Sequence, residues 1–318
     1  MRVVSDAPDR RRCLCPRAAR RHSDRRRTTI APGTRRAAPA TARHRKRVPV
    51  TLPPLLAAAL GPLMAGVVWR AGLLTTGGAL AAATLGSVTA TAGLDWMVLL
   101  LTFFFSSVLL GRLGRRAKQL RSAAVIEKSG PRDAAQVLAN GAVFGIGATF
   151  ALAGYHAGGA AAIALGALAA ATADTWGTEI GMLSCKAPRS ILTWAPLETG
   201  MSGGVSAQGL AATVAGAASL AAMAWMLSWP TATVCAAAIG GITGAMADSI
   251  LGATLQQRRR SLRTGRMTER FTDVDGTPTQ IAGGLTWLDN DGVNFAATVI
   301  GSGTASGLHM LLSSLSHA

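Results

Sequence analysis

The stretch that decides the fold class is "AGGAAAIALGALAAATADTWGTEIG", residues 157–181. The part before Asp174 carries no charged side chain, and the whole run is long enough to cross the ~30 Å hydrocarbon core of a bilayer as a helix. An aspartate, Asp174, and a glutamate, Glu179, then follow near its end. The run predicts a membrane helix, and the two acids predict a function for that end of it.

Similar apolar runs recur along residues 49–318, which we expect to form a single integral membrane domain. Eight spans are expected, at 49–69, 72–94, 95–111, 134–154, 157–181, 203–228, 231–255 and 293–314. A β-barrel is disfavoured because its strands are ~10 residues of alternating polarity. The fold class is therefore all-α, a polytopic transmembrane helix bundle of about seven or eight spans. Close helix packing is expected at three GxxxG pairs, Gly141/Gly145, Gly240/Gly244 and Gly303/Gly307.

Residues 1–48 differ sharply in composition from the rest of the chain. They hold half of the 32 Lys and Arg residues and only three acids. The segment reads as a basic, disordered leader, as a transit peptide, or as an extension caused by a start codon placed too far upstream. Nucleic-acid binding is not expected, because the basic residues are not interleaved with aromatic ones. The four cysteines show neither zinc-site spacing nor a disulfide framework.

The distribution of positive charge predicts which loops face the cytoplasm. Loops 112–133, 182–202 and 256–292 carry Lys and Arg, whereas the connections around Asp95, Tyr155 and Pro230 carry none. The positive-inside rule then places the three basic loops in the cytoplasm, at a bacterial inner membrane or an organelle membrane. Eight crossings would leave the basic residues 1–48 on the opposite side. Either the first apolar run does not span, or that leader is processed or foreign to the native chain.

The two acids of the opening stretch do not share a helix face. An intramembrane charge costs ~2.5–3.5 kcal/mol at a helix centre, so such residues usually face a cavity or a partner. Asp174 and Thr178 lie on one face, four residues apart. Glu179 points about 140° away from Asp174 on an ideal helix, unless Gly177 distorts the last turn.

A glycine turn, "TGMSGGVSAQG" at residues 199–209, is a candidate phosphate site. Ser202 is expected to cap the next helix, and Gly203 and Gly204 to present backbone N–H groups to an anion. Lys186 and Arg189, in the preceding loop, would neutralise phosphate charge. An ordinary helix start remains the plainer interpretation.

Two further polar segments occur at the ends of spans. "GAMADSILGATLQQ", residues 244–257, places Asp248 inside a span, with Ser249, Gly252 and Gln256 as a stripe towards its end. "LDNDGVNFAA", residues 288–297, crowds acids and amides, among them Asn294, around a helix start where some only cap the helix. In the assigned topology all these segments face the cytoplasm. They predict a composite site, with Mg²⁺ held by Asp174, Asp248 and Asn294, and with a phosphorylated lipid as substrate.

The chain also resembles a known family, "domain of unknown function 92", also called the transmembrane protein 19 family. The similar segments include "LTTGGALAAATLG", "ADTWGTEIG", "GGVSAQG", "ADSILGATLQ" and "DNDGVNF". A plant branch of that family looks like a kinase that converts phytyl monophosphate into the diphosphate. The resemblance implies a shared polar set, namely Asp174, Glu179, Gly203, Gly204, Asp248 and Asn294. The chain departs from the family pattern at Ser202, Asp289 and Asp291.

Three functions remain open from the sequence. The first is a prenyl (phytyl-type) monophosphate kinase that uses CTP or another nucleotide with Mg²⁺, in which Asp174, Glu179 and Asp248 are the catalytic candidates. The second is a transporter or lipid-moving protein with intramembrane acids. The third is a non-catalytic membrane scaffold. The sequence does not indicate an oligomeric state.

Overall fold

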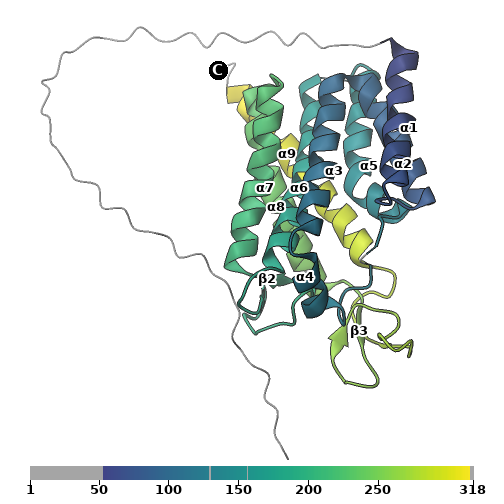
Figure 1. Cartoon of the computed structure of the whole chain (residues 1–318). Coiled ribbons are helices and arrows are strands. Elements are labelled where there is room, and N and C mark those ends of the chain that lie inside the picture. Colours follow the sequence, from purple (N-terminus) through teal and green to yellow (C-terminus); the bar gives the residue numbers. More distant parts are fainter. Residues whose placement is uncertain (1–52, 129, 156, 316–318) are drawn as a thin grey trace, which may run out of the picture. The chain divides into compact units, whose positions relative to one another are not determined.

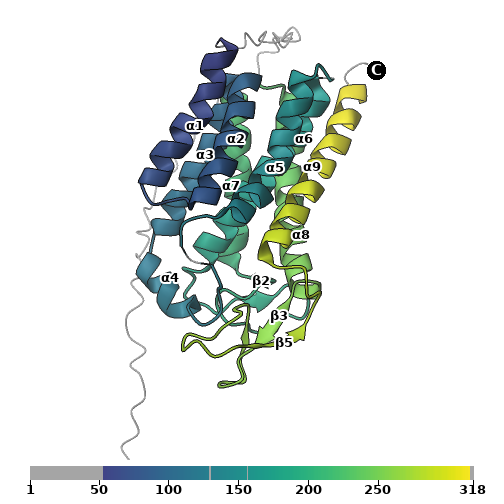
Figure 2. The same cartoon turned by 90° about the vertical axis from the view of Figure 1, so that its right-hand side faces the viewer.

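The structure, a computed structural model, describes residues 53–128, 130–155 and 157–315. The predicted leader, residues 1–48, lies outside the described residues. Eight long helices run between the same two ends of a bundle (Figures 1 and 2). They are α1 (Pro54–Arg70), α2 (Thr76–Ala92), α3 (Leu94–Arg112), α5 (Ala134–Leu152), α6 (Ala157–Gly181), α7 (Ala207–Met226), α8 (Thr231–Thr254) and α9 (Asn290–Leu315). The predicted helical membrane fold is confirmed.

The first two of the eight expected spans, 49–69 and 72–94, are shorter helices in the structure. Within the described residues, six helices are long and apolar enough to cross a membrane, namely α3 and α5 to α9. Helices α1 and α2 have 17 residues each, about 26 Å at 1.5 Å per residue, against a ~30 Å core. They pack as a close pair, because a Cβ on Gly86 would lie 2.8 Å from Gly61 Cα.

Helix α6 lies at the centre of the bundle and packs against α5, α7, α8 and α9. Its residues from Ala160 to Ala173 are almost all buried. The Ala- and Gly-rich sequence explains this position, because small side chains let several helix backbones approach at once. A Cβ on Gly166 of α6 would lie 2.7 Å from the carbonyl oxygen of Gly301 in α9. The opening stretch is therefore the core of the fold as well as one wall of its site.

The three GxxxG pairs have different outcomes. Gly240/Gly244 does form a close crossing with α9, as predicted. Gly141/Gly145 contacts the Leu85 side chain rather than a backbone. The prediction that Gly303/Gly307 is a packing pair was wrong, because no described residue lies within 4 Å of a Cβ added at either position. Gly301 faces the core instead, and residue 303 points about 200° away from it around the helix.

Alanine substitutions at Gly244 and Gly307 should therefore have clearly different effects on the stability of the protein. A Cβ at Gly244 would lie 2.5 Å from Ala170 Cβ and 2.7 Å from the Ala297 carbonyl oxygen. We expect Gly244→Ala to destabilise the protein by about 1–3 kcal/mol, the usual cost of overpacking. Gly307→Ala, in open space, should be neutral or stabilise by about 0.5–1 kcal/mol through helix propensity. Thermal unfolding in detergent measures both, and equal shifts would contradict the assigned packing.

The three basic loops lie together at one end of the bundle (Figure 2). They hold the short helix α4 (Arg115–Ser122) and four short strands, and a fifth strand directly follows the second loop; the all-helical expectation included none of these strands. Strands β1 (Arg189–Ser190) and β2 (Gly204–Val205) pair antiparallel. Strands β3 (Arg258–Arg260), β4 (Met267–Thr268) and β5 (Gln280–Gly283) form an antiparallel sheet in the order β4-β3-β5.

The three-stranded sheet is fixed to the segment after α4. Thr268 Oγ1 donates a hydrogen bond to the Ala124 carbonyl at 2.8 Å, and the Glu269 N–H donates to the Val125 carbonyl at 3.0 Å. These bonds hold Glu269 over the end of the bundle.

Candidate functional site

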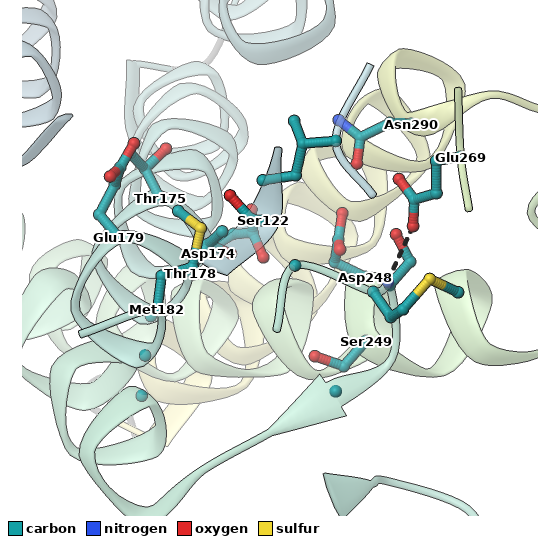
Figure 3. A pocket seen from close by; sticks show the side chains of 18 of the residues that line it. Ser122, Asp174, Thr175, Thr178, Glu179, Met182, Asp248, Ser249, Glu269 and Asn290 are labelled. Carbon is teal, nitrogen blue, oxygen red and sulfur yellow. Dashed lines mark hydrogen bonds between the residues drawn. The ribbon is translucent and has the colours of Figure 1, made fainter. Parts of the chain in front are cut away.

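A polar cavity of about 430 Å³ opens at the loop end of the bundle. Side chains from α4, α6, α8, the start of α9 and the connecting loops line it (Figure 3). Its acidic lining residues are Glu127, Asp174, Glu179, Asp248, Glu269, Asp289 and Asp291. Its basic lining residues are Arg115, Lys118 and Lys128. The segments that the sequence singled out therefore meet in one place, together with residues that it did not single out.

Asp174 of α6 and Asp248 of α8 are the central pair of carboxylates. Both side chains turn towards the space between their helices (Figure 3). Within the described part of the chain, no hydrogen bond or ion pair is made by Asp174. The Oδ2 atom of Asp248 is buried and has no hydrogen-bond partner there. A buried carboxylate oxygen without a partner is costly, which makes this atom a candidate for binding a ligand.

Two residues that follow α8 in the chain, Gln256 and Glu269, lie beside this pair of carboxylates. Glu269 accepts a hydrogen bond from the Ser202 N–H at 2.8 Å and another from the Gln256 side chain. Burial raises the pKa of Glu269 above its ordinary value. Gln256 is 2% exposed, and its Oε1 atom is buried without a partner within the described residues. Both Asp174 and Glu269 lie near enough to Asp248 to repel its negative charge.

These four side chains form an oxygen-only donor set with no side-chain cation among them. We call Asp174, Asp248, Gln256 and Glu269 the acidic cluster. Carboxylate and amide oxygens are the ligands that Mg²⁺ and Ca²⁺ prefer. In the described part of the chain, no group of three or more His, Cys, Asp or Glu residues is placed so that it could hold a metal ion. The four side chains therefore do not form a complete metal site by themselves.

Glu179 is committed to an ion pair on the other side of the cavity. Its Oε2 atom lies 2.5 Å from Lys118 Nζ, which also donates to the Leu110 carbonyl at 2.6 Å. Figure 3 shows Glu179 pointing away from Asp174, as an undistorted helix requires. Gly177 does not bend α6, which is continuous, but lets it approach Thr213 of α7 closely. Glu179, for which the sequence predicts a catalytic role, is therefore held in an ion pair with Lys118.

Lys128 ties the start of α5 to the start of α9. Its Nζ atom lies 2.8 Å from Asp133 Oδ2 and 2.5 Å from Asp291 Oδ2. Burial alone would lower the pKa of Lys128, but these two hydrogen bonds outweigh it and raise the pKa above its ordinary value. Asp133 also caps α5 in a reciprocal capping box with Gln136. Lys128 and Asp291 are thus mutually neutralised.

The glycine turn differs from the expectation in two ways. Ser202 was wrong as the helix cap, because α7 begins at Ala207 and the Ser206 side chain caps it. The N–H groups are also largely used, since Ser202 N–H donates to Glu269 and Gly204 N–H to the Met201 carbonyl. Gly203 is required for a different reason. Its φ is +78°, and a Cβ there would lie 2.5 Å from Ala253 Cβ.

Two expected phosphate ligands lie outside the cavity. Arg189 belongs to β1, where its Nη1 atom donates to the Trp194 carbonyl at 2.8 Å, and Lys186 is exposed nearby. Arg115 of α4 lines the cavity instead. Asn294 lines it as predicted, although its Nδ2 atom donates to the Asn290 carbonyl of its own helix at 2.9 Å. Glu269 carried no sequence signal, because it stands among arginines in a polar loop.

Comparison with known proteins identifies relatives over most of this architecture. The family described as "Integral membrane protein DUF92" matches residues 59–302. "Protein PGR" of Arabidopsis thaliana is 30% identical over 243 residues, which cover 67% of this chain and 81% of that protein. "Uncharacterized membrane protein MJ0933" of Methanocaldococcus jannaschii is 33% identical over 178 residues, 52% of this chain and 67% of that protein. No solved structure matches the chain.

Proposed function

We propose that this chain, which belongs to the DUF92 family of integral membrane proteins, is a kinase that converts a prenyl (phytyl-type) monophosphate into its diphosphate. The phosphoryl donor would be CTP or another nucleoside triphosphate. The observation that supports this most directly is the buried, unpartnered Oδ2 atom of Asp248, beside Asp174 and Glu269 in a cavity that is large enough for phosphate groups.

The charge of the cavity lining determines what else must bind. Seven acidic side chains face three basic ones, and Lys118 and Lys128 are already paired with acids. Two anionic substrates would be repelled from this lining unless divalent cations entered with them. The proposal therefore includes Mg²⁺.

The residues present fit Mg²⁺. Asp174 and Asp248 would bind it through their carboxylates, and Glu269, Gln256 or Asn294 would contact it directly or through water. Mg²⁺ is commonly held by one or two carboxylates together with substrate phosphates, so a complete protein cage is not needed. When bound, it would neutralise charge on the transferring phosphoryl group.

The reaction needs alignment more than covalent help. A phosphate oxygen of the prenyl monophosphate forms a bond to the γ-phosphorus of the nucleotide, the bond from that phosphorus to the β–γ bridging oxygen breaks, and the nucleoside diphosphate leaves. The acceptor is already ionised, so no side chain has to remove a proton. Arg115 would orient a phosphate, and the hydroxyl of Thr178 would donate a hydrogen bond to one of its oxygens.

The direct test is a lipid-kinase assay on membranes that contain the full chain. The membranes are incubated with γ-labelled CTP or ATP, Mg²⁺, and phytyl or geranylgeranyl monophosphate, and the lipid product is separated by chromatography. The expected result is labelled diphosphate that depends on both Mg²⁺ and the prenyl phosphate. Absence of diphosphate above a vector control with every donor and chain length would refute the kinase.

The excess of acids also favours a second candidate, a transporter that moves a cation across the membrane. The two functions differ in their products. A transporter would carry a divalent cation into sealed proteoliposomes and would form no new lipid, whereas the kinase would form diphosphate in open membranes.

Cation binding can be measured without turnover. We expect Mg²⁺ to raise the thermal stability of the purified protein, by about 2.7 kcal/mol at 100 times its dissociation constant. Asp248→Asn should remove most of this stabilisation, because it removes a charged ligand. Asp275→Asn changes an exposed loop acid outside the cavity and should leave it unchanged. Equal Mg²⁺ stabilisation of wild type and Asp248→Asn would argue against the metal site.

A further inference from the structure

A second, apolar slot of about 110 Å³ lies among α1, α2, α3 and α5. Its apolar lining residues include Met64, Val68, Leu85, Met97, Leu101 and Phe103. Two of these are methionines, whose flexible side chains adapt to irregular apolar ligands. The slot is comparable to apolar cavities that bind one small hydrocarbon, such as the 150 Å³ cavity that accepts benzene.

The slot and the polar cavity are neighbours, separated by side chains that line both. Gln136, Asn140 and Thr175 line both of them. Two of these boundary groups are satisfied internally, since Gln136 belongs to the capping box of α5 and Asn140 Nδ2 donates to the Gln136 carbonyl at 3.0 Å. A molecule that extends from the polar cavity into the slot would pass from a polar to an apolar environment across one layer of side chains.

Arg132 is the charged side chain that lines the slot. Its guanidinium group lies 5.4 Å from the centre of the Phe104 ring and interacts electrostatically with Glu179 of the polar cavity. Arg132 lines the slot and not the polar cavity, so its positive charge would attract the anionic end of a ligand whose hydrocarbon part enters the slot.

We propose that the slot holds the isoprene unit adjacent to the phosphate of the substrate. This inference rests on the proposed function and names the part of the site that recognises the chain. Only one layer of side chains separates the polar cavity from the apolar slot. The site therefore favours a ligand whose hydrocarbon chain is attached directly to the phosphate, as in a prenyl monophosphate. A phospholipid places glycerol and ester groups between phosphate and acyl chains, and those polar groups would fall within the slot.

The test is photolabelling, which does not depend on turnover. The full chain in nanodiscs is illuminated with a prenyl monophosphate that carries a diazirine on its first isoprene unit, and the labelled peptides are mapped by mass spectrometry. We expect label on residues that line the slot, and competition by geranylgeranyl monophosphate but not by inorganic phosphate. Label on lipid-facing positions only, or competition by phosphatidic acid instead, would overturn the proposal.

Variants on α2 provide matched controls. Ala82 lines the slot, whereas Thr84 on the same helix is exposed. Ala82→Phe should fill the slot and weaken labelling by about tenfold, as expected for loss of roughly two buried methylene groups. Thr84→Phe should label like wild type. If Ala82→Phe does not fold, Leu101→Ala enlarges the slot and should increase labelling by a bulkier benzophenone analogue. Unchanged labelling in both slot variants would refute the assignment.

The labelling experiment and the kinase assay can refute the slot assignment and the kinase separately. Slot labelling without diphosphate formation would keep the slot and remove the kinase. Diphosphate formation with labelling outside the slot would keep the kinase and remove the chain site. In the kinase assay, Ala82→Phe should raise KM for geranylgeranyl monophosphate without a matching loss of kcat.

Discussion

Asp248→Asn should lower the rate of prenyl-phosphate phosphorylation by about 100- to 1000-fold, the range seen when one electrostatic contact to a transition state is removed. Asparagine keeps the size of the side chain but removes the charge that would bind Mg²⁺. Asp174→Asn should have a similar effect, because the two carboxylates face the same space (Figure 3). The measurement is kcat and KM in the lipid-kinase assay over a range of Mg²⁺ concentrations.

The same variant should be at least as stable as wild type without Mg²⁺. In the native chain Asp248 is repelled by both Asp174 and Glu269, and its Oδ2 atom is buried without a partner among the described residues. Removing one of these charges relieves repulsion, and we expect a gain on the order of 1 kcal/mol. Loss of activity with a gain in stability distinguishes a functional carboxylate from a structural one. Normal kcat in Asp248→Asn would rule out its assigned role.

Removal of Lys118 should have the largest effect on stability. Its Nζ atom is bonded to Glu179 and to the Leu110 carbonyl, and the two side chains are 7% and 22% exposed. Lys118→Met leaves the Glu179 carboxylate without its partner, which we expect to destabilise the protein by about 3–5 kcal/mol. Arg132 also attracts Glu179, which favours the lower end of that range. Unfolding by denaturant in detergent micelles measures the change.

A double variant separates structure from catalysis. Lys118→Met with Glu179→Gln removes both charges and should recover part of the lost stability, because the Glu179 carboxylate is no longer left without Lys118, although Arg132 loses the charge that attracts it. Its kinase activity should stay within a few-fold of wild type if Glu179 only positions neighbouring groups. The exposed pair Arg263–Asp275 is the control, and Arg263→Met should change stability little. A double variant that is stable but inactive would return Glu179 to the catalytic set.

The basic loops illustrate how far the sequence predicts the site. Because apolar spans alternate in direction, the sequence predicted that loops 112–133, 182–202 and 256–292 lie at one end of the bundle, as Figure 2 shows. Asp174, Asp248 and Asn294 do line one cavity at that end. Individual partners were not predictable in the same way. Lys186 and Arg189 have the right charge in the right loop, yet the loop folds into a strand pair that keeps them outside the cavity.

The sequence by itself determined the helical membrane fold, the shared end of the polar segments and the opposed faces of Asp174 and Glu179. These properties follow from span length, hydropathy and helical period, which are local and repeat along the chain. Only the tertiary structure decided that Lys118 neutralises Glu179, that Glu269 and Gln256 join Asp248, and that Gly301 rather than Gly303 packs against α8. Such choices depend on distances between residues far apart in sequence, which are fixed when the helices pack.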